Sequence, residues 1–182
     1  NGTANMLTGP AMTREQAESA IRVGMETADE SIDNGVQMIA TGEMGIGNTT
    51  PSAAITAVLC GRAPAEVTGR GTGIDDAGLQ RKIRIIERCI AVNQPDPGDA
   101  MDVLCKIGGL EIAGMAGVVI AAAARRVPVV LDGLISTVAA AIAVELVPET
   151  KHYLIAGHLS EEIGHRILLE KLGLRPLIQL NM

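Results

Sequence analysis

Aromatic side chains are almost missing from this sequence of 182 residues, which has one tyrosine and neither tryptophan nor phenylalanine. A hydrophobic content of 47% still allows a continuous core, which must consist of Ala, Val, Ile, Leu and Met. Small side chains of this kind predict close helix packing. The shortage of rings also leaves nothing for nucleic-acid bases to stack on, and the net charge of −6 disfavours contact with a phosphate backbone. We therefore expect no nucleic-acid partner.

Paired cysteines and long uninterrupted apolar runs are missing too. Cys60, Cys89 and Cys105 are odd in number, lack CxxC spacing and lie in apolar segments, which indicates buried free thiols. The most apolar stretch, residues 110–124, contains Glu111 and several glycines, so it predicts a buried helix and not a membrane span. No basic segment precedes an apolar stretch at the start of the chain. We expect a cytoplasmic protein without a membrane partner.

Strand-like and helix-like patterns alternate along the chain. Amphipathic spacing and a capping box between Thr13 and Gln16 predict a helix over residues 12–34. Short apolar runs of strand length lie at residues 36–41, 127–133, 152–158 and 175–180. Further helical patterns lie at residues 50–61, 75–93, 99–109, 110–126, 134–147 and 160–173. This alternation predicts an α/β fold, a Rossmann-like three-layer parallel sheet with helices on both faces, in a single domain over residues 1–182.

The last helical pattern carries its own start and stop signals. Ser160 is expected to be its N-cap, and Gly173 is expected to end it. The strand-like run at 175–180 then has no covering element after it. In this architecture the loops after the strands carry the chemistry, so we expect the chain to be a fragment.

The stretch ATGEMGIGNTTPSAAI at residues 40–55 follows a predicted strand and leads into a predicted helix. A loop in this place lies at the carboxyl edge of the sheet, where open α/β folds bind ligands. Its glycines can adopt positive φ angles, and the start of the next helix attracts negative charge. The stretch therefore predicts an anion site, most plausibly for a phosphate. Its expected binding residues are Gly45, Ile46, Gly47, Asn48 and Thr49.

Known phosphate loops match this stretch only in part. GIGNTT has the first two glycines of GxGxxG but not the third, and Asn48 stands where a P-loop needs its lysine. A dinucleotide fold and a nucleoside triphosphatase are both disfavoured, and Lys82 is a candidate for the missing cation. A glycine-rich turn without a ligand remains the alternative. Glu43 in the same loop is expected to bond a ribose hydroxyl or accept a proton, or else to cap nearby backbone N–H groups.

Two later strand ends have similar character. Asp132 and Gly133 follow the run at 127–131, and Gly157 and His158 follow the run at 153–156. These tips are expected to face the same crevice, although Asp132 could be a helix N-cap and His158 a solvated loop residue. No carboxylate or cysteine stands at ligand spacing from a histidine, so we expect no metal and no cofactor. The serines lack a G-x-S-x-G context, which gives no support to a nucleophilic triad.

Several stretches together resemble the nicotinate-nucleotide:dimethylbenzimidazole phosphoribosyltransferase family, and the likeness covers nearly the whole chain. They are NGTANMLTGPAMT, GEMGIGNTTPSAAI, NQPDPGDAMDVLCKIGGLEIAGMAGVVIAAA, PVVLDGLISTVAAA, YLIAGHLS and LEKLGLRPLIQLNM. The resemblance implies transfer of 5-phosphoribose from nicotinate mononucleotide to 5,6-dimethylbenzimidazole by a homodimer with a large α/β domain. It implies that the chain is most of that large domain.

The resemblance also implies roles for individual residues. GEMGIGNTT would hold the ribose phosphate, and Lys82 matches a lysine of the family that reaches the phosphate. Gly157 and His158 lie where the family also approaches the phosphate, beside the strand tip of Asp132 and Gly133. The family's catalytic base is a glutamate in a GEG segment that this chain does not include, so Glu43 is expected to assist catalysis at best. Two alternatives stay open: a related transferase with a phenolic or purine acceptor, and a non-catalytic nucleotide-binding module.

Overall fold

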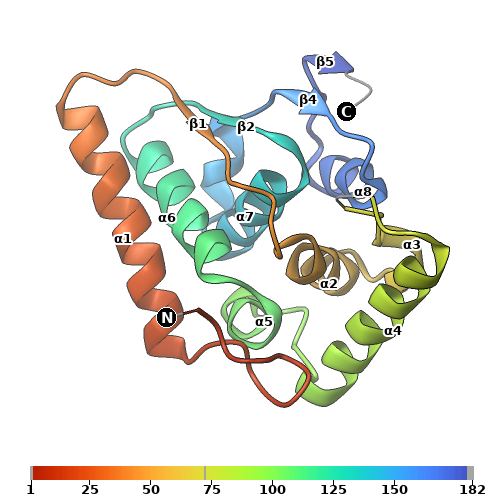
Figure 1. Cartoon of the computed structure of the whole chain (residues 1–182). Coiled ribbons are helices and arrows are strands. Elements are labelled where there is room, and N and C mark those ends of the chain that lie inside the picture. Colours follow the sequence, from red (N-terminus) through yellow and green to blue (C-terminus); the bar gives the residue numbers. More distant parts are fainter. Residues whose placement is uncertain (1, 72, 180–182) are drawn as a thin grey trace.

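A three-stranded parallel sheet lies at the centre of the fold. The computed structural model describes residues 2–71 and 73–179. Strands β1 (Ile39–Thr41), β2 (Val129–Leu131) and β3 (Leu154–Ala156) pair in parallel in the order β1-β2-β3 (Figure 1). The expected α/β class with parallel strands is confirmed. Each strand is shorter than its apolar run because pairing covers only three residues in each.

A second parallel pair is formed by β4 (His158–Leu159) and β5 (Ile178–Gln179). The last strand-like run therefore forms its strand pairing with β4, and the Leu177 N–H also donates to the Ala156 carbonyl at the end of β3 (2.9 Å). Leu180 at the end of the run lies outside the described residues. Gly157 connects β3 to β4, and a Cβ atom on it would lie 3.1 Å from the Leu131 carbonyl oxygen. This close backbone approach explains the glycine.

The helices follow the sequence patterns closely. They are α1 (Arg14–Asp33), α2 (Thr49–Cys60), α3 (Pro64–Val67), α4 (Asp76–Asn93), α5 (Ala100–Ile107), α6 (Leu110–Ala124), α7 (Gly133–Leu146) and α8 (Ile163–Leu172), with a 3₁₀ helix η1 (Pro148–Tyr153). The Thr13–Gln16 capping box is present, and Gly173 ends α8 in the left-handed conformation. The N-cap expected at Ser160 is wrong. Glu162 occupies that position, because Ser160 bonds the buried His165.

The pair α1 and α6 shows how a core without aromatic rings is packed. A Cβ atom on Gly24 would lie 1.8 Å from the Gly114 carbonyl oxygen, and one on Gly117 would lie 2.0 Å from that of Ile21. The two helix backbones therefore touch, as expected for small-residue packing. The glycine-interrupted helix α6 thus makes its close contact within one chain.

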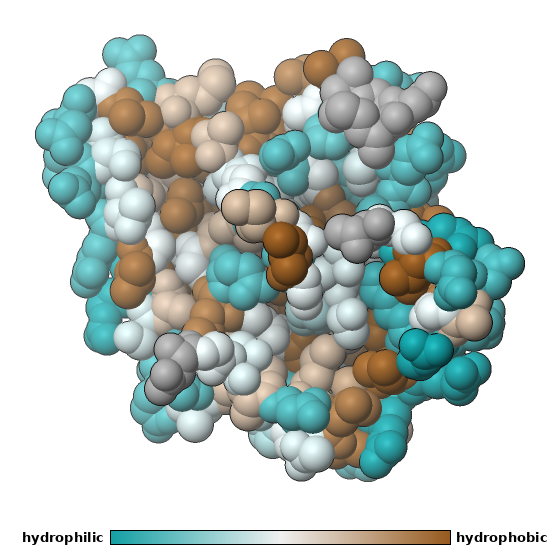
Figure 2. Space-filling model, viewed as in Figure 1, coloured by the Kyte–Doolittle hydropathy of each residue, from teal (hydrophilic) through white to brown (hydrophobic). Residues whose placement is uncertain are grey.

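The two faces of the central sheet differ in burial. Helices α6 and α7 pack against its strands, and the face with Thr41, Leu131 and Ala156 is buried. Ala40 on the other face is exposed. Figure 2 shows apolar side chains at the surface over the connection from α1 into β1, where Met38 is 56% exposed. Among the described residues, no helix is long and apolar enough to cross a membrane.

Candidate functional site

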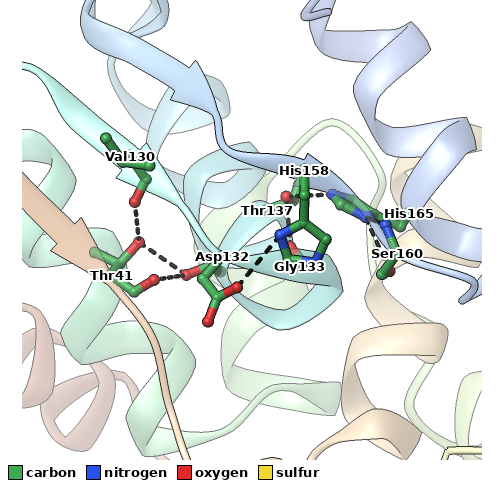
Figure 3. A network of polar contacts seen from close by, with 9 residues as sticks. Thr41, Val130, Asp132, Gly133, Thr137, His158, Ser160 and His165 are labelled. Carbon is green, nitrogen blue, oxygen red and sulfur yellow. Dashed lines mark hydrogen bonds and ion pairs between the residues drawn. The ribbon is translucent and has the colours of Figure 1, made fainter. Parts of the chain in front are cut away.

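The carboxyl ends of the three central strands meet at one pocket of about 760 Å³. Asp132 joins these ends: one carboxylate oxygen lies 3.4 Å from Nδ1 of His158 after β3 (Figure 3). The other lies 3.5 Å from where a Cβ atom on Gly42, after β1, would stand. Although Asp132 occupies the N-cap position of α7, its side chain makes no capping bond. It lines the pocket between the strand tips.

The structure brings five of the eleven expected site residues into the lining of this pocket. Glu43, Thr49, Asp132, Gly133 and His158 line the pocket. Gly157 lies behind it, with its N–H bonded to the Leu131 carbonyl (3.0 Å). A neighbouring hollow of about 530 Å³ is lined by further members of the glycine stretch: Ile46, Gly47 and Asn48, together with Glu43. Gly45 lines neither.

The glycine stretch folds as its residue types predict. Gly45 and Gly47 have φ angles of 75° and 79°, and Cβ atoms on them would meet nothing within 4 Å. Glycine is needed there for backbone conformation and not for space. Glu43 Oε2 accepts the N–H of Gly45 and the side-chain amide of Asn48. One of the expected ligand-binding amides is therefore already occupied by the loop's own carboxylate.

The start of α2 retains donors for an anion. The first turn of a helix leaves N–H groups without intrahelical partners, and Pro51 has no N–H, so the amides of Asn48, Thr49 and Thr50 are available. Lys82 Nζ donates to Thr49 Oγ1 (3.0 Å) and to the Gly69 carbonyl (3.2 Å). Within the described chain, Lys82 forms no ion pair. Burial lowers the pKa of Lys82, and the nearby Glu162 carboxylate opposes this change.

The segment from Thr68 to Gly71 and the turn from Ser160 to Glu162 also line the pocket, and the sequence analysis missed both. Glu162 Oε1 accepts the N–H of Gly71 (2.9 Å). The glycines at positions 69, 71 and 73 were a usable signal, because three glycines also lie close together in the sequence at residues 42–47. Glu162 had no such signal, since its partner lies 91 positions away.

His165 is fully buried and belongs to a chain of hydrogen bonds behind the pocket (Figure 3). Its Nδ1 accepts the N–H of Ser160 (3.0 Å), and its Nε2 lies 3.0 Å from Thr137 Oγ1. Burial, followed by the neighbouring His158, lowers the pKa of His165 to about 4, and Asp132 opposes this shift. The side chain is therefore neutral near pH 7. No cluster of potential metal ligands occurs among the described residues.

Comparison with known proteins connects this pocket to a family. A family model described as phosphoribosyltransferase, DBI_PRT, matches residues 1–182. The chain belongs to this phosphoribosyltransferase family. The resemblance drawn from the sequence stretches is thereby confirmed, because the match covers the glycine stretch, the strand tips and Lys82 together.

Relatives of the chain carry a more specific name. It is 58% identical to the nicotinate-nucleotide–dimethylbenzimidazole phosphoribosyltransferase of Alkaliphilus metalliredigens and 56% identical to that of Desulforudis audaxviator. Each match covers 100% of this chain but 52% and 51% of the respective relatives. The chain thus spans about half the length of the curated relatives it matches.

Solved structures agree with the fold. The crystal structure of CobT from Thermus thermophilus superposes with a TM-score of 0.93 at 45% identity, over 99% of this chain and 54% of that one. A second structure, of the nicotinate-nucleotide-dimethylbenzimidazole phosphoribosyltransferase of the same organism, gives a TM-score of 0.91 at 43% identity, over 99% and 53%. The α/β arrangement of this chain is therefore that of solved relatives.

Proposed function

We propose that this chain holds the phosphoribosyl donor in a nicotinate-nucleotide:dimethylbenzimidazole phosphoribosyltransferase. The reaction would move 5-phosphoribose from nicotinate mononucleotide to 5,6-dimethylbenzimidazole and give α-ribazole 5′-phosphate. The observation that carries the proposal is the half-buried Lys82 ammonium, which lies beside the start of α2 without an ion pair in the described chain. A half-buried cation next to helix amides without intrahelical partners favours a phosphate.

The ribose would lie against the glycine stretch. Asn48 Oδ1 is buried and has no hydrogen-bond partner among the described residues. A buried acceptor without a partner is costly, so a hydroxyl donor from a ligand would be stabilising there. Glu43 uses only Oε2 for its contacts with the loop, which leaves Oε1 to accept a second ribose hydroxyl. Gly45, Ile46 and Gly47 would give the loop the shape that this placement needs.

The transfer itself needs charge stabilisation and a proton acceptor. As the acceptor nitrogen attacks the anomeric carbon, nicotinate leaves with the electron pair of its glycosidic bond, and the acceptor loses its N–H proton. The carboxylates of Glu43 and Asp132 border the pocket and would stabilise the positive charge that develops on the ribosyl carbon. We assign Glu43 an assisting role in this step. His158 and Gly157, with Gly133, would complete the wall beside the phosphate.

Calorimetry with nicotinate mononucleotide tests the donor site. Wild type is expected to bind it, and Lys82→Met and Gly47→Val are each expected to weaken binding about tenfold or more, because one loses the cation and the other strains a positive-φ position. Gly9→Val is a matched control, since a Cβ atom there meets nothing within 4 Å and its φ is not positive. Equal affinity in wild type and both site variants would refute the proposal.

The acceptor and the assembly belong to the same proposal. Product analysis with dimethylbenzimidazole, a phenol and a purine would identify the acceptor, and turnover of only the last two would select the alternative transferase. Binding without any transfer in a full-length protein would select a nucleotide-binding module.

We also infer a homodimer in the cytoplasm, testable by sedimentation velocity and by fractionation. The three free cysteines of the chain are typical of a protein from a reducing compartment.

A further inference from the structure

The segment from Ser160 to His165 comprises the turn after β4 and the first residues of α8, and it contacts two separate walls of the pocket. Ser160 and Glu162 line the pocket, while His165 lies buried beneath it. Neither Glu162 nor His165 was given a role in donor binding above. The inference made here rests on the proposal that the pocket binds the donor. The two side chains contact different segments of the chain, and each set of contacts is called an arm below.

The first arm runs from His165 to the tip of β2. A backbone N–H can only donate, so the contact from Ser160 N–H fixes Nδ1 as an unprotonated acceptor. Nε2 then carries the proton and donates to Thr137 Oγ1 (3.0 Å). The Thr137 hydroxyl in turn donates to the Gly133 carbonyl (2.7 Å). Gly133 has a φ of 71°, so this relay holds a turn that few other residues adopt.

The second arm runs from Glu162 to the segment Gly69–Gly71. Glu162 Oε1 accepts the Gly71 N–H, and Oε2 lies 1.8 Å from where a Cβ atom on Gly69 would stand. The Glu162 carboxylate therefore lies directly against the backbone of Gly69 and Gly71. Lys82 Nζ donates to the Gly69 carbonyl (3.2 Å). The segment is thus held by α4 and by the turn before α8, next to the proposed phosphate site.

We propose that the Ser160–His165 segment positions the pocket, with His165 holding the Gly133 wall and Glu162 holding the Gly69–Gly71 wall. His165 acts through other residues and does not meet the ligand. Small displacements of a binding wall reduce affinity and rate strongly, so fixing both walls before the ligand arrives is the gain from these contacts. The Ser160–His165 segment is consequently a functional element of the site, in addition to its role in connecting β4 to α8.

Matched variants test the His165 arm. His165→Asn keeps an acceptor near Nδ1, His165→Gln places an amide near Nε2, and Thr137→Val breaks the relay without changing the histidine. Thr137→Val and His165→Asn are each expected to weaken binding of nicotinate mononucleotide about tenfold, and their combination is expected to cost no more than either alone. Thermal unfolding identifies the variants that fold. A folded Thr137→Val protein with wild-type affinity would overturn this arm.

Conservative rescue tests the Glu162 arm. Glu162→Gln keeps an oxygen acceptor for Gly71 N–H, whereas Glu162→Ala removes it, so binding should fall about tenfold in the alanine variant and recover most of that loss in the glutamine variant. Glu170→Ala, which removes an exposed carboxylate from α8, is the control. Unchanged affinity in Glu162→Ala would overturn this arm. So would tighter binding, which would mean that the carboxylate competes with the ligand phosphate.

Ligand-free measurements separate this inference from the donor-binding proposal. Nitrogen-15 NMR of the imidazole is expected to show His165 as the Nε2–H tautomer, and Glu162→Ala is expected to accelerate hydrogen exchange at the Gly71 amide. Failure of wild type to bind nicotinate mononucleotide, with both ligand-free results as expected, would reject the substrate alone. The Nδ1–H tautomer, or unchanged Gly71 exchange, would reject the positioning arms whatever the substrate.

Discussion

Single residues of this chain take their roles from their immediate partners. His158 and His165 are the same residue type, yet His158 lies at a strand tip beside Asp132, while His165 is fully buried and hydrogen-bonded at both ring nitrogens. Glu43 shows the same dependence. The sequence left open whether it caps the loop or binds a ligand, and it does contact loop donors with Oε2, so any ligand must share the carboxylate with its own loop.

The buried His165 predicts a pH-dependent contribution to stability. Its pKa is about 4 in the folded chain, against 6.5 for the unperturbed group, so the unfolded state binds more protons between these values. Neutral His165 therefore favours folding fully above about pH 6.5, and we expect on the order of 3 kcal/mol to be lost as the pH falls from there to about 4. Urea unfolding of wild type and His165→Gln across this range measures the effect. The stability gap between the two proteins should narrow toward pH 4, and a constant gap would contradict the assignment.

Helices are the elements that the sequence predicts best, and the reasons are local. The Thr13 cap, the left-handed Gly61 and Gly173 at helix ends, and the apolar spacing of α4 all involve residues within one or two turns of each other. Strand limits were less predictable. Apolar runs of six or seven residues yielded strands of two or three, because strand length depends on a partner strand far away in sequence.

The contact between α1 and α6 predicts opposite results for two glycines in the same interface. Gly24→Ala would place a methyl group 1.8 Å from the Gly114 carbonyl oxygen, and it should lower the free energy of unfolding by about 1–3 kcal/mol. Gly114→Ala meets only the Ala20 carbonyl oxygen at 3.8 Å, and better helix propensity should make it neutral or stabilising by up to about 1 kcal/mol. Thermal unfolding distinguishes them. Similar losses in both variants would argue against backbone contact at Gly24.

The chain as a whole is expected to unfold as one domain, which a pair of natural probes can test. Tyr153 is the one tyrosine of a sequence without tryptophan, so it provides the intrinsic fluorescence, and it lies in η1, which packs on α6 and α7. Cys89 is fully buried in α4, which packs on α2, α3 and α5. In urea, tyrosine fluorescence and Cys89 thiol labelling should therefore change over the same transition. Labelling of Cys89 at lower urea than the fluorescence change would indicate a separately unfolding unit.

The α/β class, most of the helices and the positive-φ glycines of the loop followed from the amino-acid order, because turns, caps and periodicity depend on neighbours a few positions apart. The residue types also pointed to an anion site at the strand tips. Folding added what local rules do not contain. It placed Glu162 against Gly71, 91 positions away, and His165 against Thr137, 28 positions away. Such pairings arise from the packing of whole helices against one sheet, so they decide which backbone segments form the pocket and what holds them in place.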